Sequence, residues 1–266
     1  MILEKLVKTA AACAASREQN KPFKEIERRL PQAAQPLGFI AALTGAEGVG
    51  LIAELKPASP SAGVIRQPFE AADLAAGLAA GGADCLSVLT EEQHFQGSLD
   101  NLERANVGIP RLQKDFVVSE YQILEGRVAG ADAVLLIAEA LAPDRARELC
   151  RFALSLGMDV LYEAHDDARI QQVVALAEAQ PDRILVGINN RDLQTFRVDL
   201  QTTLRALKSI PAALHVVGES GIHTAADAQL LHDAGARGIL VGESLMRQRD
   251  VAQAVRALLS SVRKTD

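Results

Sequence analysis

Short apolar runs recur along the chain at a regular interval. Most are continuous stretches of four or five residues rich in Val, Ile and Leu, and their starts lie roughly 23 to 34 residues apart, about the span of a βαβ unit. Runs of this kind are typical of parallel strands that are buried on both faces. The eight predicted strands are Leu51–Leu55, Cys85–Leu89, Pro110–Lys114, Ala133–Ile137, Val160–Glu163, Ile184–Ile188, His215–Gly218 and Gly238–Val241.

Segments rich in Ala, Leu, Glu and Arg separate these runs and predict helices. Examples are Glu70–Ala80, Glu120–Ala129, Arg145–Leu156, Asp166–Ala177, Leu200–Lys208 and Ala225–Ala234. Several end in Gly-Ala-Asp or Gly-Ala-Arg, which supplies a C-cap glycine before the next strand. Eight strand–helix units predict an α/β fold, a single (β/α)8 TIM barrel over 48–266, with 1–47 as a helical extension packed across one end. The alternative is a doubly wound open sheet, but no GxGxxG or P-loop motif follows the first strand.

Composition narrows the class of protein. The 266 residues carry a net charge of −6 and are 48% hydrophobic, and this acidic balance argues against a nucleic-acid-binding protein. No apolar run reaches 18 residues, which excludes a predicted membrane span. The charged N-terminus does not resemble a secretory signal, and three scattered cysteines without a CxxC pair are typical of a reducing compartment. We therefore expect a globular protein of the cytoplasm.

Charged side chains stand at the exits of several predicted strands, where barrels of this kind place their catalytic groups. Glu54 and Lys56 share one face at the end of the first strand, because side chains alternate with a period of two. Lys114 ends the third strand, and burial there is expected to lower its pKa. Glu163 ends the fifth strand and offers a carboxylate for proton transfer. A structural ion pair and a surface lysine are the alternative interpretations of these charges.

The last three strands contribute polar groups and glycine-rich turns. Asn189 and Arg191 follow the sixth strand, in a cluster with no obvious role in a core. The motif Gly-Glu-Ser occurs after both the seventh and the eighth strand, and paired turns at these places often bind phosphate. The five histidines and three cysteines show no spacing typical of a metal site, so no metal or other cofactor is predicted.

These residues lie within blocks that resemble the indole-3-glycerol-phosphate synthase family of tryptophan biosynthesis. The similarity runs from about residue 50 to 250, through IAELKPASPSAG, CLSVLTEEQHFQGS, QKDFVVSEYQI, GADAVLLIA, LYEAHD, VGINNRDLQTF, VGESGI and VGESLMR. The resemblance implies a (β/α)8 barrel that closes the indole ring of 1-(2-carboxyphenylamino)-1-deoxyribulose 5-phosphate. Carbon dioxide and water are released without a cofactor, so the enzyme is expected to be a carbon–carbon lyase.

The resemblance also implies roles for individual residues. Lys114 matches the general acid and Glu163 the catalytic carboxylate; Lys56 would contact the substrate carboxylate, and Glu54 would hold the lysines. The remaining positions fall into three sets. The phosphate-binding positions are Ser59, Gly221, Gly242 and Glu243, and the pocket for the aromatic ring is formed by Phe95, Phe116 and Leu135. The polar positions around the sugar are Asn189, Arg191 and Ser220. Of these, Asn189 and Ser220 also belong to the catalytic set.

Two positions depart from the family pattern. Pro57 stands where a second basic residue is common, and Ala62 where a lysine is common, so positive charge is lost beside an anionic substrate. A phosphosugar isomerase and a non-catalytic phosphate-binding barrel are the competing interpretations. The expected partner is a small phosphorylated substrate, with neither nucleic acid nor membrane, and the chain is expected to be a monomer with transient contacts to other tryptophan-pathway enzymes.

Overall fold

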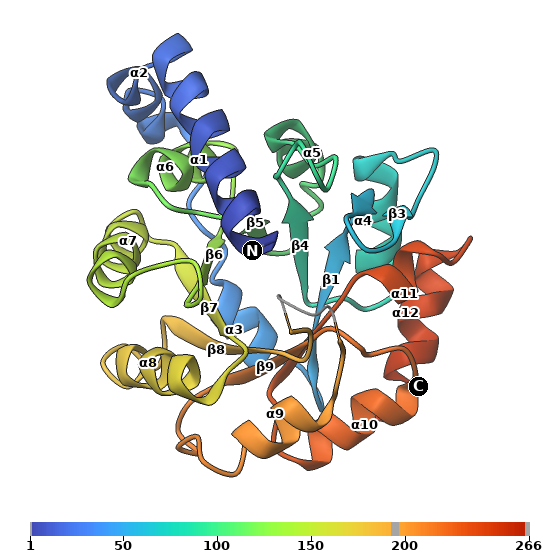
Figure 1. Ribbon diagram of the computed structural model, residues 1–266. Coiled ribbons are helices and arrows are strands. Elements are labelled where there is room, and N and C mark those ends of the chain that lie inside the picture. Colours follow the sequence, from blue (N-terminus) through green and yellow to red (C-terminus); the bar gives the residue numbers. More distant parts are fainter. Residues whose placement is uncertain (1, 193–196, 264–266) are drawn as a thin grey trace.

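The computed structural model describes residues 2–192 and 197–263 and forms a closed parallel barrel surrounded by helices (Figure 1). Neighbouring strands follow the order β1-β10-β9-β8-β7-β6-β5-β4, and β1 also pairs with β4, which closes the ring. This confirms the predicted TIM barrel. The barrel strands are β1 (Gly50–Leu55), β4 (Cys85–Leu89), β5 (Arg111–Lys114), β6 (Ala133–Ile137), β7 (Asp159–Ala164), β8 (Ile184–Asn189), β9 (Val216–Glu219) and β10 (Gly238–Val241).

Five of the nine outer helices of the described residues begin at a residue whose side chain caps them. Ser119 and Gln122 form a reciprocal capping box at the start of α6, and Thr224 and Asp227 do the same for α10. The short helix α5 was absent from the predicted segments, although Ser98 caps it. The outer helices are α4 (Ala71–Ala80), α5 (Leu99–Arg104), α6 (Glu120–Val128), α7 (Pro143–Ser155), α8 (Asp167–Ala177), α9 (Gln201–Ala206), α10 (Ala225–Asp233), α11 (Glu243–Met246) and α12 (Val251–Leu259).

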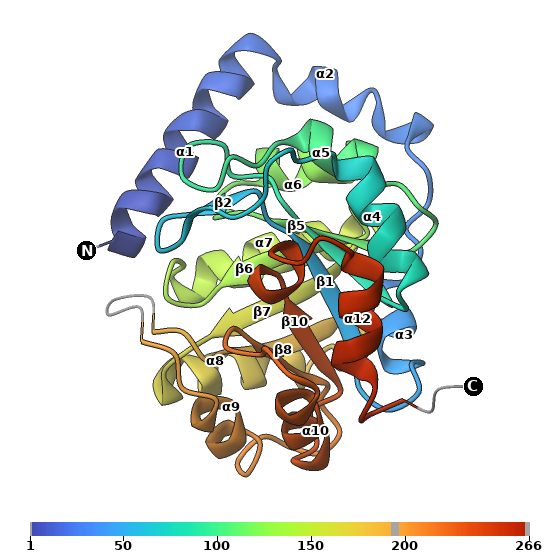
Figure 2. The same ribbon diagram turned by 90° about the vertical axis from the view of Figure 1, so that its right-hand side faces the viewer.

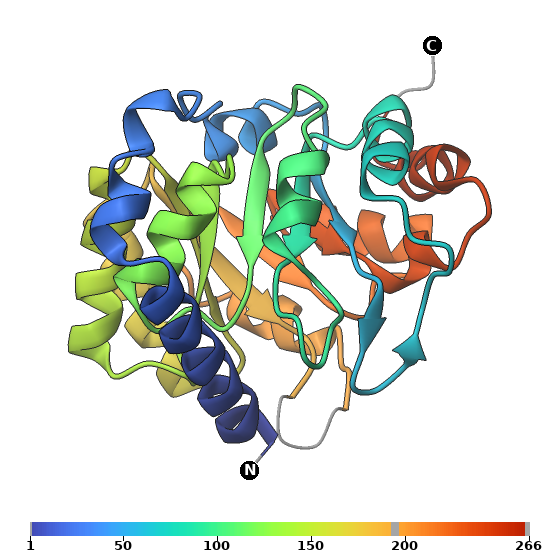
Figure 3. The same ribbon diagram turned by 90° about the horizontal axis from the view of Figure 1, so that it is seen from above.

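The N-terminal extension reaches both ends of the barrel (Figure 2). It comprises α1 (Ile2–Asn20), α2 (Phe23–Glu27), the 3₁₀ turn η1 (Leu30–Gln32) and α3 (Phe39–Thr44). Helix α3 closes the end where the strands begin, because its Phe39, Ile40 and Leu43 are buried against the barrel interior. Helix α1 packs on α6, and its first residues lie at the opposite end (Figure 3). The expectation of packing across one end therefore describes α3 but not α1.

Alternate residues of each strand enter different cores. In β1, Leu51, Ala53 and Leu55 pack against the outer helices, whereas Ile52 lies in the barrel interior with α3. Because side chains alternate with the predicted period of two, Glu54 also faces the barrel interior. A short hairpin of β2 (Ala58–Ser59) and β3 (Gly63–Val64) follows β1 at the barrel mouth. No helix of the described residues combines the length and apolarity needed to cross a membrane.

Candidate active site

Two adjoining cavities of about 120 and 80 Å³ open at the carboxyl ends of the strands. All fourteen residues singled out from the sequence line one or both of them. Those of the first cavity are Glu54, Lys56, Ser59, Phe95, Lys114, Phe116, Leu135, Glu163, Asn189, Arg191, Ser220 and Glu243. The second cavity adds Gly221 and Gly242 and shares six residues with the first, so the two form one site.

Lys114 lies among three buried carboxylates. Its Nζ atom is 3.5 Å from Glu163 Oε2, 3.6 Å from Glu219 Oε2 and 3.9 Å from Glu54 Oε1. Burial alone would lower the pKa of Lys114, but the three carboxylates outweigh burial and raise it. The expectation of a lowered pKa was wrong because it considered desolvation without the acidic neighbours that the barrel brings together.

Glu54 holds both lysines. Its Oε2 atom is 2.5 Å from Lys56 Nζ, while Oε1 faces Lys114. Burial would raise the pKa of Glu54, but the two ammonium groups outweigh it and lower the pKa, so this carboxylate is ionised. Gly242 makes room for it, since a Cβ at this position would collide with the Glu54 carboxylate. The glycine after β10 therefore serves the acid–base group as well as the turn.

Glu219 is the buried acid that sequence reasoning missed. Burial, and then the neighbouring Glu163, raise the pKa of Glu219 well above its ordinary value. A Cβ at Gly187 would lie 2.6 Å from Glu219 Oε1, so the glycine in β8 leaves space for this side chain. Val217 faces the barrel interior, and the period of two then places Glu219 inward as well. That signal was available in the sequence, but the Gly-Glu-Ser motif was interpreted only as a phosphate-binding turn.

Asn189 fixes the orientation of Glu163. Its Nδ2 atom donates to Glu163 Oε1 at 2.7 Å, and its Oδ1 atom accepts from the backbone N–H of Arg191 at 2.9 Å. These bonds leave Glu163 Oε2 directed at Lys114, and this oxygen accepts no hydrogen bond from the described residues. The arrangement can pass a proton between a lysine and a carboxyl group that face one another.

The glycine-rich turns form the second cavity. Ser220 and Gly221 both have positive φ, 66° and 76°, which turns the backbone sharply after β9. Across the cavity lie Gly242 and Glu243, but the Glu243 carboxylate pairs with Arg247 at 2.8 Å, so the backbone is the part of Glu243 suited to an anion. The cavity combines these turns with Lys56 and is suited to a phosphate group.

An apolar cleft forms the other side of the site. The rings of Phe95 and Phe116 are 6.1 Å apart and inclined by 49°, and Leu135 lies in the same cavity. Leu3 and Leu6 of α1 also line it, although the resemblance covered the N-terminal segment only loosely. The cleft is suited to a flat aromatic ring, and the turns on the other side of the site are suited to a phosphate group.

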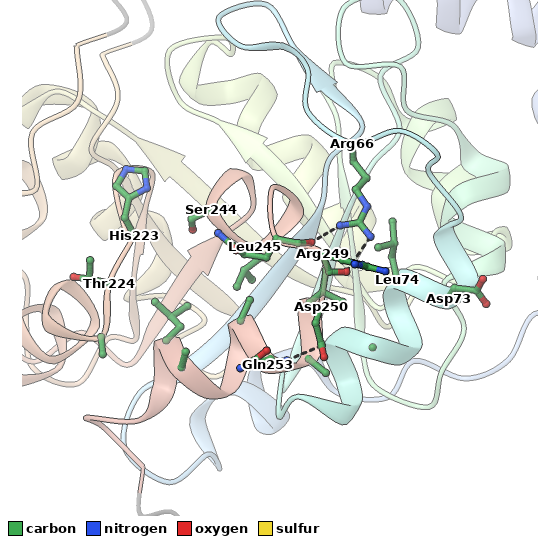
Figure 4. A pocket seen from close by; sticks show the side chains of 18 residues that line it. Arg66, Asp73, Leu74, His223, Thr224, Ser244, Leu245, Arg249, Asp250 and Gln253 are labelled. Carbon is green, nitrogen blue, oxygen red and sulfur yellow. Dashed lines mark hydrogen bonds between the residues drawn. The ribbon is translucent and has the colours of Figure 1, made fainter.

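A third cavity, of about 1020 Å³, lies outside the barrel between α4 and α12 (Figure 4). Arg66 lies at its edge and donates to the backbone carbonyls of Met246 at 3.3 Å and Arg249 at 3.4 Å. These bonds fasten the chain after the β2–β3 hairpin to the segment after α11. The cavity contains none of the buried lysines or glutamates and is not the candidate active site.

The site offers proton-transfer groups and no cluster of metal ligands. Within 2–192 and 197–263, no group of three or more His, Cys, Asp or Glu side chains is arranged to hold a metal ion. The buried carboxylates are instead paired with Lys56 and Lys114.

Comparison with protein families shows to which family the chain belongs. The family described as indole-3-glycerol phosphate synthase matches residues 3–258. The chain belongs to this family. Proteins of that name are 51% identical in Rhodopirellula baltica (84% of this chain, 85% of the relative), 44% in Bordetella pertussis (94% and 95%) and 42% in Azospirillum brasilense (97% and 99%).

Solved structures show the same fold at much lower identity. The 3-hexulose-6-phosphate synthase of Salmonella typhimurium superposes with a TM-score of 0.63 at 16% identity, over 80% of this chain and 98% of that one. The tryptophan synthase alpha subunit of Pyrococcus furiosus gives 0.59 at 16%, over 79% and 97%. These likenesses concern the barrel alone. The indole-3-glycerol phosphate synthase family is therefore indicated by sequence, and the barrel by both comparisons.

Proposed function

We propose that this protein is an indole-3-glycerol phosphate synthase of tryptophan biosynthesis. Its reaction converts 1-(2-carboxyphenylamino)-1-deoxyribulose 5-phosphate into indole-3-glycerol phosphate, carbon dioxide and water. The observation that carries the proposal is the position of Lys114, between the aromatic cleft and the glycine-rich turns and in contact with three carboxylates. A substrate with an aryl group at one end and a phosphate at the other places its ketone between these two features.

Ring closure is the first chemical step. The ring carbon that bears the carboxylate attacks the ketone carbon, and Lys114 donates a proton to the ketone oxygen. Lys56 pairs with the substrate carboxylate, while Glu54 holds both ammonium groups in place. The raised pKa of Lys114 keeps it protonated before the substrate binds. The new bond leaves a cationic nitrogen in conjugation with the ring.

Decarboxylation and dehydration follow. Loss of carbon dioxide returns its bonding electrons to the ring and neutralises the nitrogen, which restores aromaticity. The hydroxyl formed from the ketone then leaves as water, and a hydrogen on the adjacent carbon is removed as a proton. We assign the base in this step to Glu163, which Asn189 orients, and the acid to Glu219, because its raised pKa keeps a proton available.

We assign substrate binding to three sets of residues. Ser59, Gly221, Gly242 and Glu243 surround the phosphate, and Phe95, Phe116 and Leu135 contact the aryl ring. Arg191 and Ser220 lie between them and contact the sugar. The enzyme is thus a carboxy-lyase that needs no cofactor. A monomeric state, transient contacts with other tryptophan-pathway enzymes and a cytoplasmic location stay predictions.

The proposal is tested by following the fluorescence of the indole product after the purified protein is mixed with the carboxyphenylamino substrate. We expect product formation, and we expect it to persist after dialysis against EDTA. A protein that binds the substrate without forming indole would support a non-catalytic barrel. Isomerisation of a phosphorylated sugar without release of carbon dioxide would support the phosphosugar isomerase. Activity lost to EDTA and restored by Zn²⁺ or Mg²⁺ would contradict the metal-free mechanism.

A further inference from the structure

A buried carboxylate outside the acid–base group holds the loop that carries Phe95. Glu91 follows β4 and is only 4% exposed. Its Oε2 atom accepts from the backbone N–H groups of His94 at 2.7 Å and Phe95 at 3.0 Å, and Oε1 accepts from the N–H of Gln93 at 3.2 Å. Three backbone donors on one carboxylate fix the path of this loop, and hence the position of the Phe95 ring.

A second buried carboxylate does the same for Phe116. Asp115 follows β5 and is 7% exposed. Its Oδ1 atom accepts from the backbone N–H of Phe116 at 2.8 Å, and Oδ2 accepts from the hydroxyl of Thr90 at 2.7 Å. Because Thr90 directly precedes Glu91 and its N–H bonds to the Lys114 carbonyl at 3.0 Å, the two supports belong to one network across neighbouring strands.

Helix α1 adds the positive charge that faces this acidic network. Arg17 Nε lies 3.1 Å from Glu125 on α6, and its Nη1 atom is 3.6 Å from Glu92 in the Phe95 loop. Its charge also acts on Asp115. His94 completes the set, with Nδ1 3.1 Å from Glu91 Oε1. Arg17 of α1 therefore neutralises part of the acidic charge of this network.

We propose that Glu91 and Asp115 are positioning residues for the aromatic cleft, which set the separation of the Phe95 and Phe116 rings and so select substrates that carry an aryl group. Their hydrogen bonds go to backbone N–H groups, to Thr90 and to His94. The inference rests on the proposed function, because the aryl group is that of the proposed substrate. It adds a determinant of substrate selection beside the ring-contacting side chains, since Glu91 and Asp115 line the same cavity.

The test uses isosteric variants of the full-length protein. Glu91→Gln and Asp115→Asn keep the side-chain size but replace one acceptor oxygen by an NH2 group, which cannot accept from a backbone N–H. Thr90→Val removes only the donor to Asp115. We expect KM for the aryl substrate to rise about tenfold in the first two variants, and less in Thr90→Val, with kcat changed by less than about twofold.

Two controls separate positioning from general loosening. Ribulose 5-phosphate has the sugar and phosphate without the aryl group, so its inhibition constant should stay unchanged in all three variants. Asp132→Asn is the matched variant, because Asp132 is also buried and accepts from two backbone N–H groups, those of Leu37 and Arg111, at the far end of the barrel. It should leave KM unchanged.

Several results would overturn the inference. They are an unchanged KM in Glu91→Gln and Asp115→Asn, an equal loss of affinity for ribulose 5-phosphate, or a fall in kcat at constant KM. If Asp115→Asn does not fold, an unchanged KM in Thr90→Val would overturn the part of the inference that concerns Asp115. If the wild-type protein formed no indole product, the proposed function would fail. The inference would then be judged separately, by calorimetric binding of the aryl substrate with its ketone reduced to an alcohol.

Discussion

The two ends of the barrel both bury carboxylates, but they provide for them differently. At the end where strands begin, Asp132 accepts backbone N–H groups from Leu37 and Arg111 at 2.7 Å each. Asp159 accepts the N–H of Ile40 at 3.0 Å and also pairs with Arg183 at 2.7 Å. These acids tie the N-terminal extension to the strands, and their hydrogen-bonding capacity is used within the fold.

At the mouth, the three carboxylates of the acid–base group, Glu54, Glu163 and Glu219, face one another around lysines instead. Glu163 Oε2 and Glu219 Oε1 accept no hydrogen bond from the described residues, although both are buried. Burial, and then the neighbouring Glu163, raise the pKa of Glu219, whereas at Asp132 burial also raises the pKa but backbone N–H groups and arginines lower it. The difference teaches that burial of an acid is not itself a functional signal, whereas the crowding of several carboxylates around one lysine is.

Of the changes that test this difference between the two ends, removal of the central Lys114 should have the largest effect on kcat. Lys114→Ala takes away the proposed proton donor and leaves Glu54, Glu163 and Glu219 without their shared ammonium group. We expect kcat to fall by about 10²–10⁴-fold while the fold survives, and steady-state assays with circular dichroism measure both. Arg183→Ala removes a cation from Asp159 at the other end and should leave kcat unchanged. Near-normal turnover of Lys114→Ala would exclude the proposed role.

Replacing Glu219, the acid that the sequence did not reveal, by its amide should reduce activity without destabilising the fold. Glu219→Gln keeps the shape but cannot donate the proton, so we expect kcat to fall up to about 10²-fold. The raised pKa means that folded Glu219 holds its proton at pH values where the unfolded group has lost it. Its contribution to stability therefore decreases as pH rises from about 4.5 through the folded pKa. The variant should lack this decrease in denaturant titrations, and a parallel pH dependence would contradict the assignment.

The corresponding change at the other end should show the opposite pattern. Asp132→Asn places an NH2 group opposite a backbone donor, so one of the two N–H groups loses its acceptor. We expect the free energy of unfolding to fall by about 1–3 kcal/mol, with kcat and KM unchanged, as measured by urea denaturation and steady-state kinetics. A loss of activity without a loss of stability would mean that the two ends are not divided in this way.

The smallest effect concerns charge at the rim of the mouth. Pro57 is buried, so a lysine there would place a charged side chain in a buried position. Ala62 is only half-buried and is the better position. We expect Ala62→Lys to lower KM severalfold at low ionic strength and less at physiological salt, where screening acts over about 8–10 Å. Ala62→Gln is the uncharged control, and an equal gain with it would exclude an electrostatic cause.

The sequence predicted the barrel because each buried strand is a continuous apolar run that can be recognised by itself. The eight apolar runs agree with the eight strands to within a residue or two at each end, as Pro110–Lys114 against Arg111–Lys114 illustrates. Strand exits then located Glu54, Lys114 and Glu163 in one site, since parallel strands bring their ends together. A helix after the second strand was expected from the strand–helix repeat, but the six residues of α5 were given no range of their own.

What only the tertiary structure decided is how these groups act on one another. The pKa of Lys114 rises instead of falling because acids from β1, β7 and β9 meet around it, and no local segment contains that information. The same holds for Leu3 and Leu6, which reach the aromatic cleft from a helix whose own sequence gives no sign of it. The periodicity of apolar and polar positions is a local property, so it could be recognised in the sequence. Electrostatic coupling depends on distances across the barrel, and these exist only once the strands have closed.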